Sequence, residues 1–310
     1  MTSLERPASA ELVERIKRLR GERGAFILAH NYQLPEVQDI ADFVGDSLAM
    51  AREAAKVRSR VILLAGVHFM AETAKLLNPD RIVLEPDPNA GCPMADMVTP
   101  RELAEAKRRH PDAAVVAYVN SSAAVKAMSD VCCTSANAVR VVESFPKDRP
   151  ILFVPDQCLG DYVAQKTGRT NVILWPGFCP THHRILAQHV EERRRERPDA
   201  EVCAHPECTR EVRALADFLG STGQIIRHVA ESPRKAFIIA TELGVCHTLR
   251  RRNPGKTIVE VTHLADCANM KLNTLEKILW SLEDMQFAVT VPEEVAVAAR
   301  QAIERMLAVC

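Results

Sequence analysis

Several features that assign a chain to a familiar class of protein are absent from this sequence. No stretch approaches the roughly 20 consecutive apolar residues of a membrane-spanning helix. The 40 basic and 40 acidic side chains cancel, whereas a nucleic-acid-binding protein usually carries a basic surplus. The N-terminal residues lack the apolar segment of a secretory signal. We therefore expect a cytoplasmic protein with neither a membrane nor a nucleic acid among its partners.

Aromatic side chains are scarce, whereas cysteines are plentiful. Phe, Trp and Tyr make up 5% of the chain and only three residues are tyrosine, so the position of each tyrosine is informative. In a reducing compartment the ten cysteines are not expected to form a disulfide framework; most should be buried thiols and a few could ligate a metal. With 47% hydrophobic residues, the 310-residue chain can form a sizeable core.

The chain repeats itself with a period of 87 to 88 residues. The tripeptide Pro-Asp-Ala occurs at 111–113 and again at 198–200, each time after a basic helix end and before an apolar strand. The polar residues that end the first strand of each repeat are His30, Tyr118 and His205, which are 88 and 87 residues apart. This regular spacing indicates three copies of one structural unit.

Each repeat is predicted to contain three strands separated by helices. The strands are expected at 25–30, 61–65 and 81–84, at 114–118, 151–154 and 171–174, and at 201–205, 237–240 and 257–261. Apolar residues at helical spacing predict helices at 49–57, 103–109, 123–128, 210–219 and 275–282, with flanking helical segments at 9–19 and 278–307. Alternating strands and helices are typical of parallel sheets with helical crossovers.

The sequence therefore predicts an α/β protein of three similar small units, each a parallel sheet in a three-layer arrangement. The expected boundaries are 1–22 for an N-terminal helix packed on the core, 23–98, 99–184 and 185–270 for the units, and 271–310 for C-terminal helices. Because a unit of about 85 residues buries a core with difficulty on its own, we expect the three to pack with pseudo-threefold symmetry around a central active site.

One cysteine follows the third strand of each repeat. Cys92, Cys179 and Cys267 are 87 and 88 residues apart. Threefold packing would bring them together, and three thiolates suit an iron–sulfur cluster with one iron left open as a Lewis acid. Duplication alone could also leave three buried cysteines. Zinc is the main rival, because 179–183 and 205–208 both have zinc-like spacing, but zinc does not explain the equivalent trio.

A small hydroxyl recurs at a predicted helix start in each repeat. Ser47, Ser135 and Thr222 are 88 and 87 residues apart. A single copy would be interpreted as a helix N-cap. Three copies converging on one axis instead favour a cradle for an anionic ligand with carboxylate or phosphate groups, because helix N-termini attract anions.

The ends of the first strands supply acid–base groups. These segments are 30–32, 118–120 and 205–207, and they contain two of the three tyrosines. Because parallel α/β sheets bind ligands at the carboxyl ends of their strands, these imidazole, phenol and carboxylate groups are expected beside the cysteines. Such a set is suited to proton transfer and loss of water.

The motifs together resemble those of the quinolinate synthase family, the A protein of bacterial NAD biosynthesis. They extend from residue 30 to about residue 280. The matching stretches are His30-Asn31-Tyr32-Gln33, Gly45-Asp46-Ser47-Leu48, Gly91-Cys92-Pro93-Met94-Ala95, Tyr118-Val119-Asn120-Ser121, Cys133-Thr134-Ser135-Ala136-Asn137, Pro155-Asp156, His205-Pro206-Glu207-Cys208, Gly220-Ser221-Thr222-Gly223, Thr241-Glu242 and Cys267-Ala268-Asn269-Met270-Lys271.

This resemblance implies condensation of iminosuccinate (iminoaspartate) with dihydroxyacetone phosphate to quinolinate, with release of phosphate and water. It also implies one [4Fe–4S] cluster per chain, on Cys92, Cys179 and Cys267. The catalytic residues implied are Tyr32, Tyr118, His205 and Glu207. The substrate-binding residues implied are His30, Ser47, Tyr118, Asn120, Ser135, His182, His205, Glu207, Ser221 and Thr222. A transient contact with L-aspartate oxidase, the source of the imine, is a further expectation.

The sequence departs from the family pattern at one place. Some members carry a Cys-x-x-Cys run just before the last cluster cysteine, but residues 261–266 contain no cysteine here, so a redox switch of that kind is not expected. Two other functions stay open: a different [4Fe–4S] dehydratase acting on a hydroxy acid, and a zinc-stapled scaffold that binds a metabolite.

Overall fold

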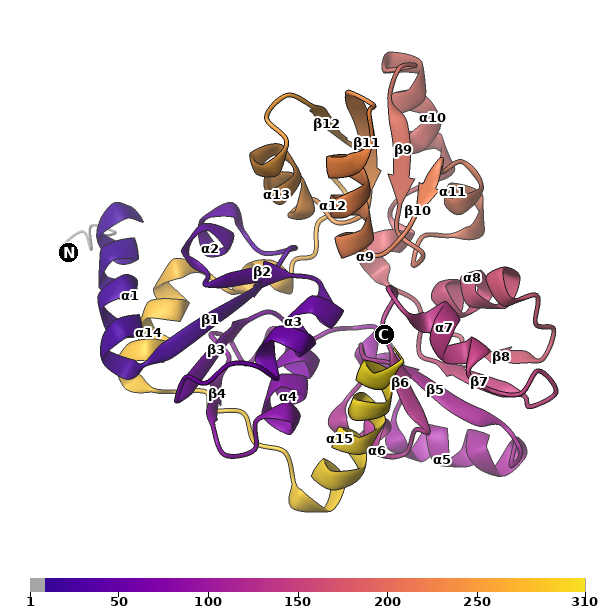
Figure 1. Ribbon diagram of the computed structural model, residues 1–310, viewed down its shortest axis with the longest axis horizontal. Coiled ribbons are helices and arrows are strands. Elements are labelled where there is room, and N and C mark those ends of the chain that lie inside the picture. The colour runs from indigo at the N-terminus through magenta and orange to yellow at the C-terminus, as the bar shows by residue number, and fades with distance from the viewer. Residues whose placement is uncertain (1–8, 310) are drawn as a thin grey trace, which may run out of the picture.

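A computed structural model describes residues 9–309 of the chain, which form three α/β units (Figure 1). Each unit contains one four-stranded sheet, and all strand pairs within the sheets are parallel. The first sheet has the order β2-β1-β3-β4, the second β6-β5-β7-β8 and the third β10-β9-β11-β12. The strand order is therefore the same in all three units.

The strands predicted from the repeat are confirmed, with small shifts at their ends. They are β1 (Ala25–His30), β3 (Val61–Ala65), β4 (Ile82–Leu84), β5 (Ala114–Tyr118), β7 (Ile151–Val154), β8 (Val172–Leu174), β9 (Glu201–Ala204), β11 (Ala236–Ala240) and β12 (Thr257–Glu260). The two central strands of each sheet are almost entirely buried, which explains why they appear in the sequence as continuous runs of apolar residues.

Each sheet also has an edge strand that the sequence did not predict. These strands are β2 (Phe43–Gly45), β6 (Val131–Cys133) and β10 (Phe218–Leu219). They are only two or three residues long, too short to show a period of two along the sequence. Each pairs with the carboxyl half of the first strand of its unit; Gly45, for example, lies opposite His30.

Helices connect the strands and cover the sheets. They are α1 (Ser9–Arg23), α2 (Pro35–Ile40), α3 (Ser47–Ala54), α4 (His68–Leu77), α5 (Pro100–Arg109), α6 (Ala123–Ala127), α7 (Ala138–Glu143), α8 (Gln157–Thr167), α9 (Pro180–His183), α10 (Ala187–Glu196), α11 (Arg210–Ala214), α12 (Thr222–Glu231), α13 (Val245–Arg252), α14 (Leu275–Asp284) and α15 (Glu293–Ala308). Short 3-10 turns at Ala95–Met97 and Met270–Leu272 follow two of the predicted cluster cysteines.

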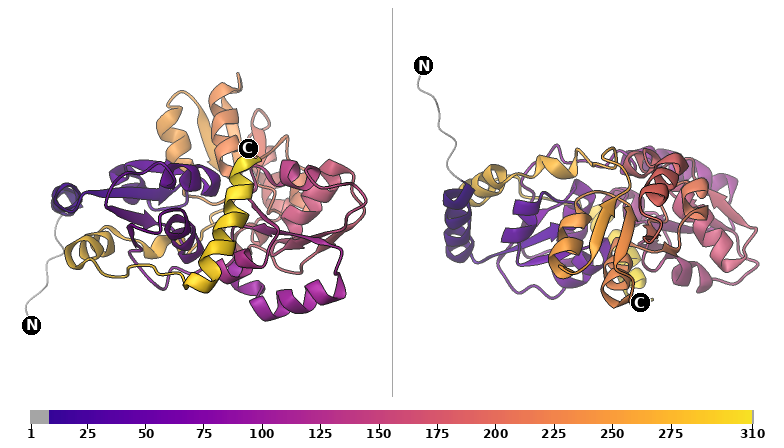
Figure 2. Two further views of the ribbon diagram at one scale, coloured as in Figure 1. Left: turned by 60° about the horizontal axis from the view of Figure 1, so that its bottom comes forward. Right: turned by 90° about the horizontal axis from the view of Figure 1, so that it is seen from above.

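The predicted C-terminal helical segment is divided into two helices that pack on different units. The chain leaves the helical conformation after Asp284, where Met285 and Phe287 have positive φ angles. Helix α14 packs beside α1 against the first sheet, and α15 packs on α6 and β6 of the second unit. Figures 1 and 2 show α15, in yellow, between the first and second units.

The fold places the carboxyl ends of the strands around one pocket. His30 and Tyr118 are the last residues of β1 and β5, and His205 directly follows β9. The three loops after β4, β8 and β12 carry the predicted cluster cysteines. Among residues 9–309, no helix combines the length and the apolar character needed to cross a bilayer. Residues 1–8, which contributed to the prediction that a secretory signal is absent, lie outside the described residues.

Candidate active site

The largest group of predicted site residues lines one pocket supplied by all three units. It encloses about 920 Å³, part of which is open to solvent. The predicted residues in its wall are His30, Tyr32, Ser47, Cys92, Tyr118, Asn120, Ser135, Cys179, His182, His205, Glu207, Thr222 and Cys267.

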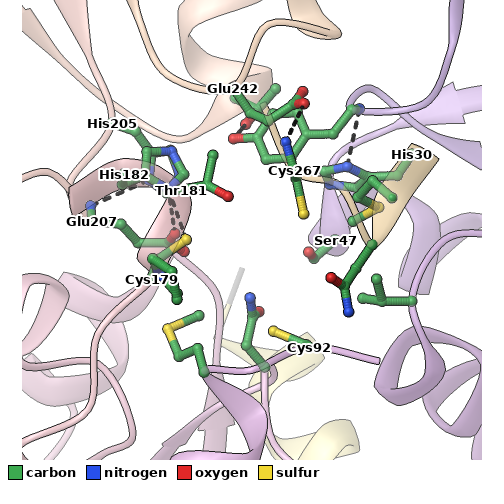
Figure 3. Close-up of a pocket in the computed structure, with 18 of the residues that line it drawn as sticks. His30, Ser47, Cys92, Cys179, Thr181, His182, His205, Glu207, Glu242 and Cys267 are labelled. Carbon is green, nitrogen blue, oxygen red and sulfur yellow. Dashed lines mark hydrogen bonds and ion pairs between the residues drawn. The ribbon is translucent and has the colours of Figure 1, made fainter. Parts of the chain in front are cut away.

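The equivalent cysteines of the three units are brought to this pocket, as the repeat predicts. Figure 3 shows the sulfur atoms of Cys92, Cys179 and Cys267 pointing into the central space from different sides. All three are half-buried free thiols. Burial raises the pKa of Cys92 to about 12, and it also raises the pKa values of Cys179 and Cys267. Without a bound cation these side chains are therefore neutral thiols at pH 7.

The other described cysteines do not line the pocket. Cys132, Cys133, Cys203 and Cys246 are buried among apolar side chains. The zinc alternative at 205–208 loses a ligand, because Cys208 Sγ is directed to the carbonyl oxygen of Ala240, 3.4 Å away. Cys310, predicted to be a plain thiol, lies outside the described residues.

Glu207 is the central polar group of the pocket and is only 3% exposed. Its Oε1 accepts the hydroxyl hydrogen of Tyr118 at 2.5 Å, and its Oε2 lies 2.8 Å from Nδ1 of His182. Burial opposes ionisation, but the neighbouring imidazoles and these hydrogen bonds outweigh burial and hold the pKa of Glu207 below its usual range. The carboxylate is therefore charged at neutral pH.

His30 and His205 occupy equivalent positions and have the same hydrogen-bond arrangement. In each, Nδ1 accepts the backbone N–H of the residue two positions later, at 3.2 Å. Burial lowers the pKa of His30 to about 4 and that of His205 to about 3, so both rings are neutral at pH 7. Because Nδ1 is an acceptor, the single proton is assigned to Nε2, and each ring is a neutral N–H donor. His205 Nε2 lies 3.1 Å from the hydroxyl of Ser135.

Tyr32 is the second phenol that lines the pocket. Its hydroxyl is 2.7 Å from the hydroxyl of Thr222 and 2.8 Å from that of Thr241. Burial raises the pKa of both tyrosines well above the usual value, and the charge of Glu207 adds to this effect. Both phenols therefore retain their protons at neutral pH and can act as proton donors.

The recurring hydroxyls are not helix caps. Ser47 and Thr222 are the first residues within α3 and α12, whose N-caps are Asp46 and Ser221. Ser135 lies two residues before Asn137, the N-cap of α7. The N-cap interpretation of the three predicted hydroxyls is therefore wrong, and all three hydroxyl-bearing residues line the pocket instead.

Ser221 does not join the other predicted binding residues in the pocket wall. It caps α12 by accepting the backbone N–H of Gln224, and its hydroxyl lies 3.1 Å from Oδ2 of Asp46. Asp46 also accepts the backbone N–H groups of Ala49 and Gly223, both at 3.0 Å. One carboxylate of the first unit thus stabilises the starts of helices from two units.

Sequence reasoning assigned no role to Thr241, Glu242 or Lys271, although they fall in the matching stretches. Glu242 is completely buried and lies 2.9 Å from the ammonium group of Lys271. It also accepts the backbone N–H of Cys267 at 3.1 Å. Lys271 in turn donates to the carbonyl oxygen of Tyr32 at 2.5 Å. The only sequence feature that pointed to Glu242 was its position just after the second predicted strand of its unit, which corresponds to the position of Asp156 in the second unit.

The polar side of the pocket also contains a possible single-ion site. Ligand atoms of Cys179, His182 and Glu207 all lie within 4.8 Å of one another. Cys92 and Cys267 do not belong to this group among the described residues. The pocket is therefore compatible with a metal cofactor.

Comparison with known proteins gives consistent matches over nearly the whole chain. The family model described as "Quinolinate synthetase A protein" matches residues 14–308. The "Quinolinate synthase" of Dehalococcoides mccartyi (strain CBDB1) is 55% identical over 295 residues, which cover 95% of this chain and 97% of the relative. "Quinolinate synthase 1" of Methanosarcina acetivorans is 51% identical over 300 residues, covering 97% and 98%.

Among solved structures, the E-1-hydroxy-2-methyl-but-2-enyl-4-diphosphate reductase from Plasmodium falciparum matches 92% of this chain and 90% of its own. Its identity is 12% and its TM-score 0.33, a likeness too low to support an inference. The family model and the two relatives, by contrast, match nearly the whole chain, including the strands, the cysteine loops and the pocket residues. The chain belongs to the quinolinate synthetase A protein family.

Proposed function

We propose that this protein is a quinolinate synthase that condenses iminosuccinate with dihydroxyacetone phosphate, releasing phosphate and water. The observation that carries the proposal is the single pocket in which three equivalent cysteines face Glu207 and its phenol and imidazole partners. Relatives named for this activity are more than 50% identical over at least 97% of their length. The substrates are small molecules, which a pocket of this size accommodates.

The cofactor we propose is a [4Fe–4S] cluster held by Cys92, Cys179 and Cys267. Three free thiols on equivalent loops fit a cluster with one iron that lacks a protein ligand. When bound, the cluster would supply a Lewis acid at its open iron. Because the pKa values of the thiols are raised, loading should release protons from the three cysteines.

The arrangement that we propose for the three units is pseudo-threefold, with the axis near the pocket. The identical strand order of the three sheets and the 87- to 88-residue spacing of the cysteines support it. We assign the units to 23–98, 99–184 and 185–270, with 1–22 and 271–310 as flanking helical segments.

Binding of two anionic substrates is assigned to neutral donors. The hydroxyls of Ser47, Ser135 and Thr222 and the Nε2–H groups of His30 and His205 are neutral donors in this wall. They can bind carboxylate and phosphate oxygens without adding a buried positive charge.

Asn120 is assigned to the recognition of a hydrogen-bond donor on the substrate. Its Oδ1 is buried and has no hydrogen-bond partner among the described residues. An unpaired buried carbonyl oxygen costs about 1–3 kcal/mol. A substrate N–H or O–H group would satisfy this atom, and both substrates carry such groups.

Proton transfer is assigned to Glu207 and Tyr32. The ionised carboxylate of Glu207 can accept a proton from a substrate carbon, and it already accepts a hydrogen bond from the Tyr118 hydroxyl. The protonated phenol of Tyr32 can donate to an oxygen that leaves as water. His205 and Tyr118 hold these groups and the substrate in place.

We further propose that the protein acts in the cytoplasm and receives its imine from L-aspartate oxidase through transient contact. Iminosuccinate is an imine that water hydrolyses, so a short path from its source to this pocket would preserve it. The residue composition, with its cancelling charges, supports a metabolic enzyme rather than a nucleic-acid-binding protein.

The deciding experiment is anaerobic purification followed by metal analysis and assay. We expect about four irons and four acid-labile sulfides per chain. We also expect formation of quinolinate with release of phosphate from dihydroxyacetone phosphate. Zinc without sulfide, in protein never exposed to air, would establish the zinc-stapled scaffold instead. An intact cluster with turnover of a hydroxy acid and no phosphate release would establish another dehydratase.

A further inference from the structure

Arg184 is the one arginine or lysine that lines the active-site pocket within residues 9–309. Four carboxyl groups line the same wall, those of Asp46, Glu207, Glu242 and Asp266. His30 and His205 do not offset them at pH 7, because burial lowers their pKa values to about 4 and 3. A pocket that is proposed to take two anions therefore has more acidic than basic groups in its wall, and Arg184 is its guanidinium.

Arg184 lies where the pocket opens to solvent. Most residues of the wall are buried or half-buried, and the exposed ones are Pro93, Arg184 and Ala268. Pro93 and Ala268 directly follow two of the predicted cluster cysteines, and Arg184 is the C-cap of α9, the short helix that begins after the third. The opening is therefore bordered by all three cysteine loops, with the guanidinium beside it.

The guanidinium of Arg184 is available to a ligand. Arg194 pairs with the carboxylate of Asp217 at 2.8 Å, whereas Arg184 makes no ion pair within the described part of the chain. Its side chain donates one long hydrogen bond there, from Nη1 to the carbonyl oxygen of Asp266 at 3.4 Å. Because an arginine fork can bind a carboxylate or a phosphate through two parallel hydrogen bonds, its donors suit an anion that arrives at the opening.

The backbone around Arg184 is held without its side chain. The N–H of Arg184 donates to the carbonyl oxygen of Thr181 at 3.3 Å, and the N–H of Ile185 donates to that of His182 at 3.2 Å. The side chain of Ile185 is completely buried. Replacement of the exposed guanidinium should therefore leave α9 and the Cys179 loop in place.

We propose that Arg184 is the counter-charge that draws the anionic substrates to the pocket opening and helps to retain them. The inference rests on the proposed function, in which iminosuccinate carries two carboxylates and the phosphate of dihydroxyacetone phosphate carries close to two negative charges. Opposite unit charges about 4 Å apart in water attract each other enough to raise the local concentration roughly fivefold. For a doubly charged substrate, with part of the attraction screened by salt, we expect about a tenfold effect on affinity.

The test compares three variants of the cluster-loaded enzyme, with dihydroxyacetone phosphate as the varied substrate. Arg184→Gln removes the charge, and Arg184→Lys keeps the charge without the planar fork. Arg195→Gln is the matched control, because Arg195 is exposed, lies outside the pocket wall and donates to the backbone carbonyl oxygen of Glu191 at 3.3 Å. At low salt we expect Arg184→Gln to raise KM about tenfold with kcat within about twofold, since the lost attraction acts on binding. Arg184→Lys should stay within about threefold of wild type, and Arg195→Gln within about twofold.

Ionic strength shows whether the effect is electrostatic. Between about 20 mM and about 500 mM KCl the screening length falls from about 20 Å to about 4 Å, so the tenfold difference in KM should shrink to about twofold. A difference that persists in high salt, or an equal loss in Arg184→Lys, would overturn the proposal. Iron and sulfide content should equal wild type in every variant, and loss of the cluster in Arg184→Gln would make Arg184 a support of the Cys179 loop instead.

Calorimetric titration with dihydroxyacetone phosphate separates this inference from the proposed function, because binding needs no turnover. Wild-type protein that forms quinolinate, together with an Arg184→Gln variant of unchanged Kd and KM, overturns the role of Arg184 alone. Binding that weakens about tenfold in Arg184→Gln, in protein that forms no quinolinate, overturns the proposed function and supports the anion-attracting role. Wild-type protein that neither binds dihydroxyacetone phosphate nor forms quinolinate overturns both.

Discussion

Replacing Glu207 with glutamine should stop turnover while the cysteine site stays intact. The substitution keeps the size of the side chain and removes its charge. Glu207 now accepts from two donors, the hydroxyl of Tyr118 at 2.5 Å and Nδ1 of His182 at 2.8 Å. An amide has one oxygen and one NH₂ group, so one of these contacts becomes donor against donor.

The magnitude follows from what the carboxylate does in the structure. Each hydrogen bond to a charged group contributes about 1.5–3 kcal/mol, and Glu207→Gln loses one of two. Removal of a positioned general base costs a further factor of about 10²–10⁴ in rate. We therefore expect kcat to fall at least about 100-fold, or roughly 2.7 kcal/mol of transition-state stabilisation.

The assay is anaerobic quinolinate formation, with iron and sulfide measured on the same sample. Glu211→Gln is a matched control, since Glu211 is an exposed residue of α11 in the same unit, and it should stay within about twofold of wild type. A Glu207→Gln enzyme with full iron content and a wild-type rate would refute the proton-transfer role. A variant that cannot hold iron would refute the claim that Glu207 acts apart from the cysteine site.

Three further predictions follow from the same site. Replacing any one of the predicted ligands Cys92, Cys179 and Cys267 with serine should abolish both the cluster and the activity, whereas Cys158→Ser should retain both. Iron analysis and the activity assay measure these outcomes. In the folded protein the pKa values of His30 and His205 are about 4 and 3, so in the unfolded chain these rings take up protons first as the pH falls below about 6.5. Each ring should therefore lower the free energy of unfolding by about 2 kcal/mol between pH 7 and pH 5. Urea unfolding at the two pH values measures this loss, which should shrink in His205→Gln; an unchanged midpoint in wild type would contradict it. Gly244→Ala should lower the free energy of unfolding by about 1–3 kcal/mol, because the added Cβ would lie 2.7 Å from a backbone carbon of Tyr32. The control Gly255→Ala should be neutral, since a Cβ there meets no atom within 4 Å, and thermal unfolding of both variants measures the difference.

The repeat made much of the fold predictable from the sequence. Nine strands were found because each apolar run recurs at the same place in three units. The edge strands β2, β6 and β10 were missed because strands of two or three residues have no measurable period. C-terminal helices were predicted within 271–310, but the place of the break between α14 and α15 was not, because no Gly or Pro stands at Met285 and the two helices pack against different units.

The predictable part of the site is the part that recurs. Cys92, Cys179 and Cys267 could be found because each lies at the same position in its unit. Thr241 could not be singled out, because its contact with Tyr32 joins residues 209 positions apart and exists in one copy only. The resemblance implied a binding role for both Ser221 and Thr222, but one residue along a helix start separates a pocket hydroxyl from a cap.

The packing of α14 on the first sheet means that synthesis order and folding order differ in this protein. Ile27 and Leu63 of the first sheet share an apolar cluster with Ile278 and Leu282 of α14. At about 5–20 residues per second, a ribosome needs roughly 10–40 s to make the 190 or so residues between the end of β4 at Leu84 and the start of α14 at Leu275. During that interval all strands of the first sheet have been made, but the apolar face that α1 and α14 cover together lacks α14. The nascent first unit therefore presents a partly open apolar face until the last part of the chain emerges.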